Sequence, residues 1–199
     1  MTKGLDANQD MTEWAGQLVQ DGFGFVGRYI NSTKAHPLTK PEVIHLSSKG
    51  LYIVSLYENG NPTSIDYFTE DQAHRDGQGA ASDALRVGQP AGYPVYMPTD
   101  YDCTQDQFAQ LLRYYTIVRE CLKGDGYTAG CYGNGILCEY LANLGYVSHT
   151  WLAQSHGFTG YQEWLTRADI VQGPETTWHG IDVDLDTSNG DAGGWQIVS

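Results

Sequence analysis

The sequence predicts one compact α/β domain, a single (β/α)8 TIM barrel with a parallel sheet, spanning residues 1–199. Two observations carry this prediction. Short runs of β-branched and aromatic residues alternate with amphipathic segments, which is typical of parallel strands joined by helices. Eight such units fit a closed barrel, at the short edge of its size range. An open doubly wound sheet is the alternative, but no Gly-x-Gly-x-x-Gly follows the first run.

Each predicted strand is a short run that ends in polar residues. The run 51–57 (LYIVSLY) is the most apolar, and the run 180–185 (GIDVDL) alternates carboxylates with apolar residues. In chain order, the predicted strands are 4–6, 23–30, 51–57, 93–97, 127–132, 149–154, 168–172 and 180–185.

The intervening segments carry helix signals. Pro41 suits the first turn of a helix, and Thr104 caps the clearest helix of the chain. The buried face of that helix repeats at helical spacing through Phe108, Leu111, Leu112, Tyr115, Val118 and Leu122. The predicted helices are 11–20, 41–48, 64–87, 105–123, 135–144 and a short piece at 161–165.

Composition excludes several classes of partner. With 24 acidic and 11 basic residues, the formal net charge is −13, which repels nucleic acid and anionic membrane surfaces. No apolar run approaches the ~20 residues that cross a bilayer, so membrane insertion is not expected. The opening residues MTKGLD lead into no apolar signal core. Action in the cell envelope would then need export by a phage lysis system or a secretion machine, or a segment upstream of this chain.

Catalytic groups of a parallel barrel lie at the carboxyl ends of its strands. Several acids from distant parts of the sequence would therefore converge on one mouth. The polar residues at the predicted strand ends are Asp6, Arg28, Glu58, Asp100, Asp102, Tyr132, Gln154, Gln172, Asp182 and Asp184.

The element Asp100-Tyr101-Asp102 is the sharpest of these signals. Residues i and i+2 of a strand share one face, roughly 6.6 Å apart, and two carboxylates at that separation can divide acid and stabiliser roles. Glycoside hydrolysis needs such a pair. The alternative is that Asp102 or Thr104 only caps the following helix.

The last and third predicted strands also end in acids. Asp182 and Asp184 share an inward face, whereas Asp186 is expected as a solvated loop acid. The calcium-loop pattern fails because Thr187 and Gly193 replace the required Gly and Glu. Glu58 is either a site acid or a turn acid.

No structural zinc site is expected, because no Cys-x-x-Cys pair is present and no third ligand is spaced to join His149 and His156. A weak cation site of another kind at the last strand stays open, and no organic cofactor is implied. Five Trp and 14 Tyr in an acidic chain favour stacking against sugar rings. Trp151 and Tyr132 lie near the expected mouth, where Arg28, Gln154 and Asp182 would also bind substrate.

An ordered set of segments resembles a known family. The segments are GLDANQ, GFGFVGRYI, LYIVSLYENG, YPVYMPTDYD, YTAGCYGN, TWLAQS and GIDVDLD. Together they resemble the glycoside-hydrolase-like domain called domain of unknown function 1906, which is similar to the family 25 lysozymes, (β/α)-barrel muramidases. The resemblance spans nearly the whole chain.

The resemblance implies roles for particular acids. Asp6 matches an Asp on the lysozymes' first strand, and Asp184 matches a late Asp in a Val-Asp-Leu context. Asp100-Tyr101-Asp102 matches their Asp-x-Glu, whose Glu is the general acid. Asp102 is one methylene shorter, so the acid role passes to Asp102 on a moved loop or to Glu58.

The barrel would also bring cysteines of neighbouring units together. The pairs Cys103–Cys131 and Cys121–Cys138 are the expected disulfides, and at least one would place the protein outside a reducing cytoplasm. Free buried thiols are the alternative.

These inferences predict a retaining, muramidase-like glycosidase of bacterial peptidoglycan. Asp102 would be the acid/base, Asp100 and Glu58 would stabilise the oxocarbenium-like state, and Asp6 and Asp184 would set protonation and position hydroxyls. An inactive glycan-binding barrel is the first alternative. A structural protein, or one that binds an immunity partner, is the second.

Overall fold

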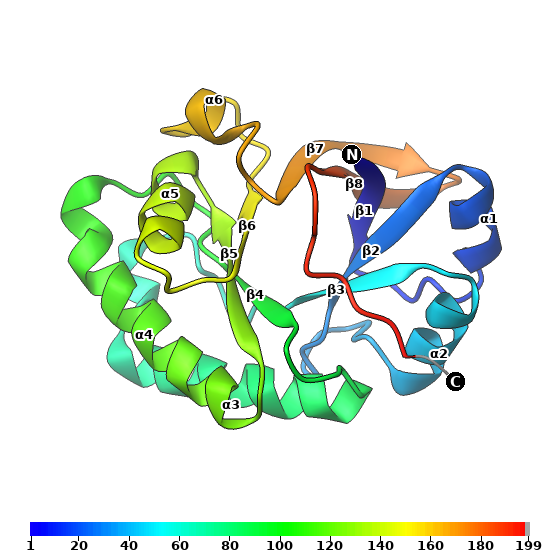
Figure 1. Cartoon of the computed structure of the whole chain (residues 1–199), viewed down its shortest axis with the longest axis horizontal. Helices are drawn as coiled ribbons and strands as arrows, with labels where there is room; N and C mark the ends of the chain where they lie inside the picture. Colours follow the sequence, from blue (N-terminus) through cyan, green and yellow to red (C-terminus); the bar gives the residue numbers. More distant parts are fainter. Residues whose placement is uncertain (198–199) are drawn as a thin grey trace.

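The computed structural model describes residues 1–197 and shows a closed barrel whose eight strands follow one another in sequence order (Figure 1). The predicted barrel is confirmed. Its strands are β1 (Thr2–Ala7), β2 (Phe23–Tyr29), β3 (Tyr52–Leu56), β4 (Pro94–Pro98), β5 (Thr128–Gly133), β6 (His149–Leu152), β7 (Ile170–Trp178) and β8 (Ile181–Ser188).

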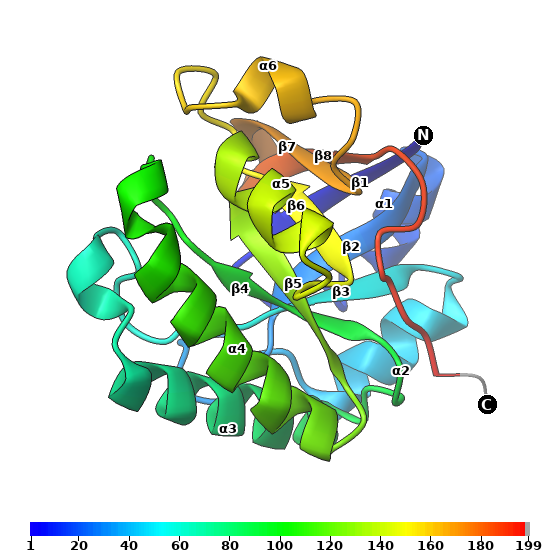
Figure 2. The same ribbon diagram turned by 60° about the vertical axis from the view of Figure 1, so that its left-hand side comes forward.

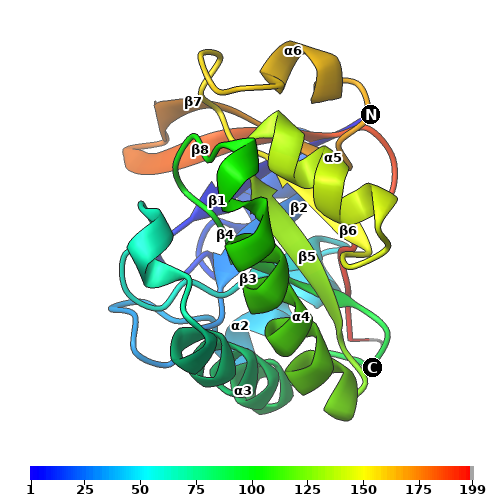
Figure 3. The ribbon, with the colours of Figure 1, turned by 90° about the vertical axis from the view of Figure 1, so that its left-hand side faces the viewer.

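Helices follow the first six strands and cover the outside of the barrel. They are α1 (Ala15–Gln20), α2 (Lys40–Ser48), α3 (Glu70–Val87), α4 (Phe108–Gly124), α5 (Gly135–Asn143) and α6 (Tyr161–Trp164). The two long helices, α3 and α4, lie side by side (Figures 2 and 3). Helix α3 begins later than the predicted 64–87, because Thr69 caps it by accepting a hydrogen bond from the Gln72 amide.

The eighth strand departs from the all-parallel prediction. Strand β8 is antiparallel to both β7 and β1, so the sheet is mixed. The cause is the turn at His179 and Gly180, whose φ angles of 51° and 87° suit a tight two-residue hairpin. Such a turn reverses the chain without a crossover helix, and the next strand must therefore run antiparallel.

The tip of the β7–β8 hairpin folds back over the outside of the barrel, towards α1 (Figure 1). The Trp178 ring packs edge-on against Trp14 and Phe23, with 5.7 Å between centroids in each pair. Its Nε1 donates to Asp21 Oδ2 at 2.8 Å. These contacts hold the hairpin where a conventional barrel would carry a helix.

Large rings fill the barrel interior, and glycines on neighbouring strands make room for them. A Cβ added at Gly4 would meet the Phe25 ring, one at Gly130 the Tyr96 ring, and one at Gly27 the Trp151 ring. The Trp151 side chain is fully buried. The floor beneath the mouth is therefore a packed, dry layer of aromatic rings.

The C-terminal segment closes the other end of the barrel. Trp195 exchanges backbone hydrogen bonds with Ile53, and its indole donates to Ser55 Oγ at 2.9 Å. Tyr96 donates to the Ala192 carbonyl from inside the barrel at 3.0 Å. Among residues 1–197, no helix is long and apolar enough to cross a membrane.

All four cysteines are free thiols, so the expected disulfides are not formed. Cys121 on α4 faces α3, where a Cβ added at Gly77 would lie 2.8 Å from the Cβ of Cys121. Cys103 instead donates to Asn134 Oδ1 at 3.3 Å, and Cys131 accepts from the Tyr115 hydroxyl at 3.4 Å. Cys138 is buried on α5, against the barrel wall.

The close approach at Gly27 makes a testable prediction. An alanine Cβ there would lie 2.7 Å from both Trp151 Cη2 and Asp6 Cβ. Gly27→Ala should therefore lower the free energy of unfolding by about 1–3 kcal/mol in urea titrations. Gly16→Ala on α1 is the matched control, because its Cβ meets nothing within 4 Å. Equal stability of the two variants would contradict the packing described.

Candidate active site

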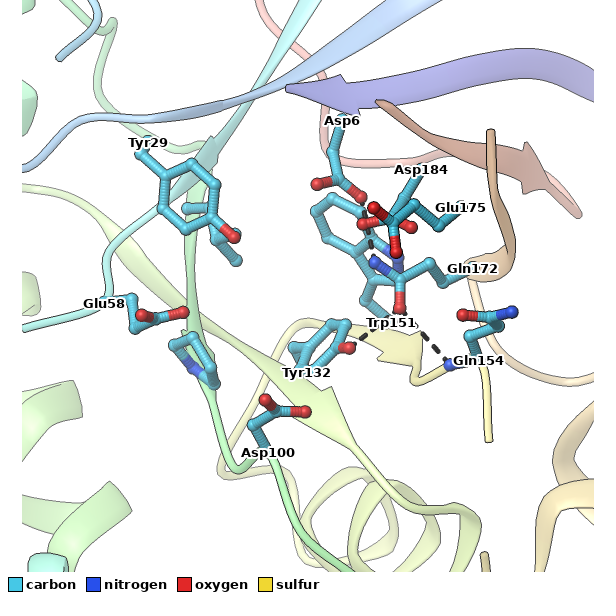
Figure 4. Close-up of a pocket in the computed structure, with 12 residues that line it drawn as sticks. Asp6, Tyr29, Glu58, Asp100, Tyr132, Trp151, Gln154, Gln172, Glu175 and Asp184 are labelled. Carbon is cyan, nitrogen blue, oxygen red and sulfur yellow. Dashed lines mark hydrogen bonds between the residues drawn. The ribbon is translucent and has the colours of Figure 1, made fainter. Parts of the chain in front are cut away.

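A cavity of about 270 Å³ opens at the mouth of the barrel, where β1 to β6 end (Figure 4). This cavity is called the mouth pocket below. Its lining residues are Asp6, Tyr29, Leu56, Glu58, Pro98, Asp100, Tyr132, Trp151, Gln154, Gln172, Glu175 and Asp184.

Five carboxylates from five different elements line the mouth pocket. Asp6, Glu175 and Asp184, from β1, β7 and β8, gather on one side of it in Figure 4. Glu58 follows β3 and Asp100 follows β4, and both lie on the opposite side. The barrel thus brings together acids that lie up to 178 residues apart (6 to 184).

Asp6 and Asp184 are neighbouring acids on two paired strands. They are direct partners in the β1–β8 ladder, and Asp6 is only 5% exposed. Burial, and then the negative charge of Asp184, raise the pKa of Asp6 to about 7. Burial also raises the pKa of Asp184, with Glu175 and Asp100 adding to the effect. Asp6 therefore keeps its proton to a higher pH than an ordinary carboxyl does.

Gln172 orients this pair and ties it to the opposite wall. Its Nε2 donates to Asp6 Oδ2 at 3.0 Å, while its Oε1 accepts from the Tyr132 hydroxyl at 2.8 Å and the Gln154 amide at 3.3 Å. These partners determine which end of the amide faces Asp6. One side chain therefore positions the acid and part of the pocket wall.

The acids of the opposite side differ in their surroundings. Burial, followed by the charge of Glu58, raises the pKa of Asp100. Glu58 accepts from Lys34 Nζ at 2.8 Å, and its backbone amide donates to Asn31 Oδ1 at 2.8 Å. Asn31 and Lys34 thus fix Glu58 at the rim of the pocket.

Asp186 lies beneath the mouth pocket, and the expectation of a solvated loop acid is wrong. It is 2% exposed, and its Oδ1 accepts from Trp151 Nε1 at 3.1 Å. Its Oδ2 has no partner among residues 1–197. Burial, then the charges of Asp6 and Asp184, hold its pKa well above the usual range.

Asp102 does not join the other acids. Strand β4 ends at Pro98, so the same-face spacing expected for Asp100 and Asp102 does not apply. The Asp102 carboxylate instead turns away and accepts from Asn134 Nδ2 and the Thr159 amide, each at 2.8 Å, and from Thr159 Oγ1 at 3.0 Å. Partial burial acts to raise the pKa of Asp102, but these hydrogen bonds outweigh it and lower the pKa.

Arg28 lies behind the barrel wall rather than at the mouth. Its guanidinium pairs with Glu42 at 2.7 Å and donates to the Ala7 carbonyl at 2.7 Å, and both charged side chains are fully buried. Because strand residues alternate in direction, the next residue, Tyr29, faces the pocket instead.

Three predicted binding residues lie in the mouth pocket, and one lies beside it. Tyr132, Gln154 and Trp151 line the pocket, although Trp151 is part of the buried floor rather than an exposed stacking surface. Asp182 is exposed and accepts from Thr177 Oγ1 at 3.1 Å. It borders a smaller adjoining cavity of about 130 Å³, which shares Asp6, Tyr29, Glu175 and Asp184 with the mouth pocket.

Sequence reasoning missed Tyr29 and Glu175. Tyr29 was missed because the residue predicted to face the mouth, Arg28, is off by one position along the strand. Glu175 was missed because the predicted strand ended at residue 172, whereas β7 runs on to Trp178 past a bulge between Gln172 and Glu175. The signal was the pair of alternating runs on either side of His179-Gly180, which is typical of a hairpin.

The raised pKa of Asp6 predicts how stability depends on pH. A carboxyl whose pKa moves from 3.8 when unfolded to about 7 when folded destabilises the fold progressively as pH rises through that window. At pH 8, Asp6→Asn should therefore raise the free energy of unfolding by on the order of 1–4 kcal/mol, with little gain at pH 4. Denaturant titrations at both pH values measure this. Asp125→Asn, at an exposed site, should change neither value.

The burial of Arg28 predicts a structural role. Arg28→Ala should lower the free energy of unfolding by about 3–5 kcal/mol, because it leaves Glu42 charged and unpaired in the interior. Arg113→Ala removes an exposed pair with Glu70 and should cost less than about 1 kcal/mol. Thermal or urea unfolding compares the two. Similar losses would rule out this role for Arg28.

Comparison with known proteins agrees with this architecture. A family model described as Rv2525c-like, glycoside hydrolase-like domain, matches residues 16–190. The uncharacterized protein YbfG of Bacillus subtilis is 28% identical over 164 residues, which cover 74% of this chain and 22% of YbfG. This chain thus spans about a fifth of the length of that curated relative.

Two solved structures show the same fold. The Tat-secreted protein Rv2525c of Mycobacterium tuberculosis, solved in complex with HEPES, superposes with a TM-score of 0.78 at 21% identity, covering 95% of this chain and 96% of the other. A muramidase from Trichobolus zukalii gives 0.57 at 14% identity, covering 96% and 95%. The resemblance to glycoside-hydrolase-like barrels is therefore confirmed. The chain belongs to the family of Rv2525c-like, glycoside hydrolase-like domains.

Proposed function

We propose that this domain hydrolyses a peptidoglycan-type glycan at the mouth pocket. The observation that carries the proposal is the division of five carboxylates between two sides of one cavity, with Asp6, whose pKa is raised to about 7, on one side. Glycosidases need an acid that protonates the leaving oxygen and a carboxylate that meets the positive charge on the ring. The fold shared with a muramidase supports the same substrate class.

The Asp6–Asp184 pair is the proton donor in this proposal. With the pKa of Asp6 raised to about 7, a proton is available near neutral pH, where an ordinary carboxyl would already be ionised. Asp184 is the more exposed member and faces the pocket, so it hands the proton to the glycosidic oxygen as the bond from that oxygen to C1 breaks. The pair takes a proton back from the water that adds to C1.

Asp100 and Glu58 face the sugar ring from the other side. Their carboxylates stabilise the positive charge that develops on C1 and the ring oxygen. Tyr29 and Tyr132, both partly exposed, offer ring faces and hydroxyls to the sugar. Rv2525c is described as Tat-secreted, and we infer that this domain likewise works on the outer side of the cell, where such a glycan lies.

An inactive glycan-binding module is the second candidate. The observation that favours it is Asp102, which stands where the lysozymes' Asp-x-Glu has its acid and here faces away from the mouth pocket. In that case the pocket would bind a glycan without cleaving it.

Mass spectrometry of purified peptidoglycan after incubation with the protein tests the proposal. We expect new reducing-end muropeptides from the wild type and at least a 100-fold loss of rate in both Asp184→Asn and Asp100→Asn. Asp102→Asn should keep the rate within about tenfold, because its carboxylate lies outside the pocket. The absence of new ends from pH 5 to 8, with binding retained, would favour the second candidate. Loss of activity only in Asp102→Asn would overturn the assignment of roles.

A further inference from the structure

The mouth pocket has a strong excess of negative charge. Five of its twelve lining residues are acids, and no lining residue is Lys, Arg or His. Lys34 reaches only Glu58, through the ion pair at 2.8 Å, and offsets one charge at the rim. Even with one proton on the Asp6–Asp184 pair, the lining keeps a net negative charge.

Three of the five pocket carboxylates also lack hydrogen-bond donors from the protein. Among residues 1–197, no side-chain or backbone donor reaches the carboxylates of Asp100, Glu175 or Asp184. Asp6 is 95% buried, yet only its Oδ2 has a donor, Gln172, and its carboxylate points into the pocket (Figure 4). Asp100 and Glu175 are exposed and Asp184 is half-buried, so these carboxylates are open to hydrogen bonds from a ligand rich in donors.

The arrangement of these acids suits an organic cation better than a metal ion. The carboxylates stand around the wall, and no group of three or more acid, His or Cys side chains within residues 1–197 is placed to hold a metal ion. A volume of about 270 Å³ is at the lower end for small-molecule sites and suits one sugar ring. The adjoining cavity, with Asp182, extends the same acidic lining along the hairpin.

We propose that the mouth pocket selects glycans whose amino sugars carry free ammonium groups rather than N-acetyl groups. This inference rests on the proposed glycan-directed function and names its substrate class. An ammonium group brings three donors and a positive charge to acids that lack both. An acetamido group brings one N–H and a carbonyl oxygen, and that oxygen would face carboxylates.

A binding comparison between matched oligosaccharides tests the proposal. Isothermal titration at pH 6 and low salt would compare a β-1,4-linked glucosamine tetramer with its fully N-acetylated counterpart. We expect the free-amine tetramer to bind at least tenfold more tightly, and its affinity to fall as salt rises. Tetralysine, with comparable charge and no sugar ring, should bind at least tenfold more weakly than the free-amine tetramer.

Variants locate the source of the preference. Glu175→Gln removes one pocket charge and should shrink the ratio of affinities at least threefold. Glu120→Gln, exposed on α4 and outside the pocket, removes the same net charge and should leave the ratio unchanged.

The possible results separate failure of this inference from failure of the proposed hydrolysis. Equal or tighter binding of the N-acetylated tetramer refutes it, and so does failure to bind either tetramer. If tetralysine binds as tightly as the free-amine tetramer, positive charge alone explains the binding, and selection of amino sugars is refuted. Peptidoglycan cleavage combined with a preference for N-acetyl groups would reject this inference and leave the hydrolase intact. A free-amine preference without any cleavage would keep the inference and reject hydrolysis.

Discussion

The register between β1 and β8 determines the chemistry of the barrel mouth. Pairing Asp6 with Asp184 brings two carboxyls together in the mouth pocket, and the same register places Asp186 opposite Gly4, one layer deeper. Three acids therefore form a column along one seam of the barrel. Like charges this close cannot all be ionised away from water, so the fold retains protons there and supports the acids with Gln172 and Trp151.

The surrounding side chains pack against this column and donate hydrogen bonds to it. Trp151 meets the backbone of β2 at Gly27 and donates to Asp186, so the ring serves both as packing and as the support for a buried acid. Gln172 links the upper acid to Tyr132 across the barrel. A site that concentrates charge lowers stability, and the packed aromatic layer beneath it compensates for that cost.

Much of this could be predicted from the sequence, because strand and helix periodicity are local signals. The order of strands, the barrel and the acids at residues 6, 58, 100 and 184 follow from short runs that end in polar residues. The sequence pattern places Asp184 at the mouth on the expectation of a parallel strand. It lies there because β8 is antiparallel and begins at the mouth.

The errors share one physical cause: the direction of a side chain depends on contacts that the local pattern does not contain. The sequence pattern places Arg28 at the mouth, but the strand register places Tyr29 there and turns Arg28 to the outer side of the barrel wall. Asp102 leaves the strand geometry because β4 ends at Pro98, and Thr159, far away in sequence, supplies its donors. Asp186 is polar in the sequence, yet the closed barrel buries it.

The two-residue turn at His179-Gly180 has an evolutionary consequence. Because β7 and β8 are consecutive, one uninterrupted stretch, 170–188, carries Gln172, Glu175, Asp182 and Asp184, while the six preceding strand–helix units supply the opposite wall. Recombination or a local insertion in that stretch would exchange these four ligand-facing residues together. The barrel could thus acquire a new specificity without altering the helices that hold its scaffold together.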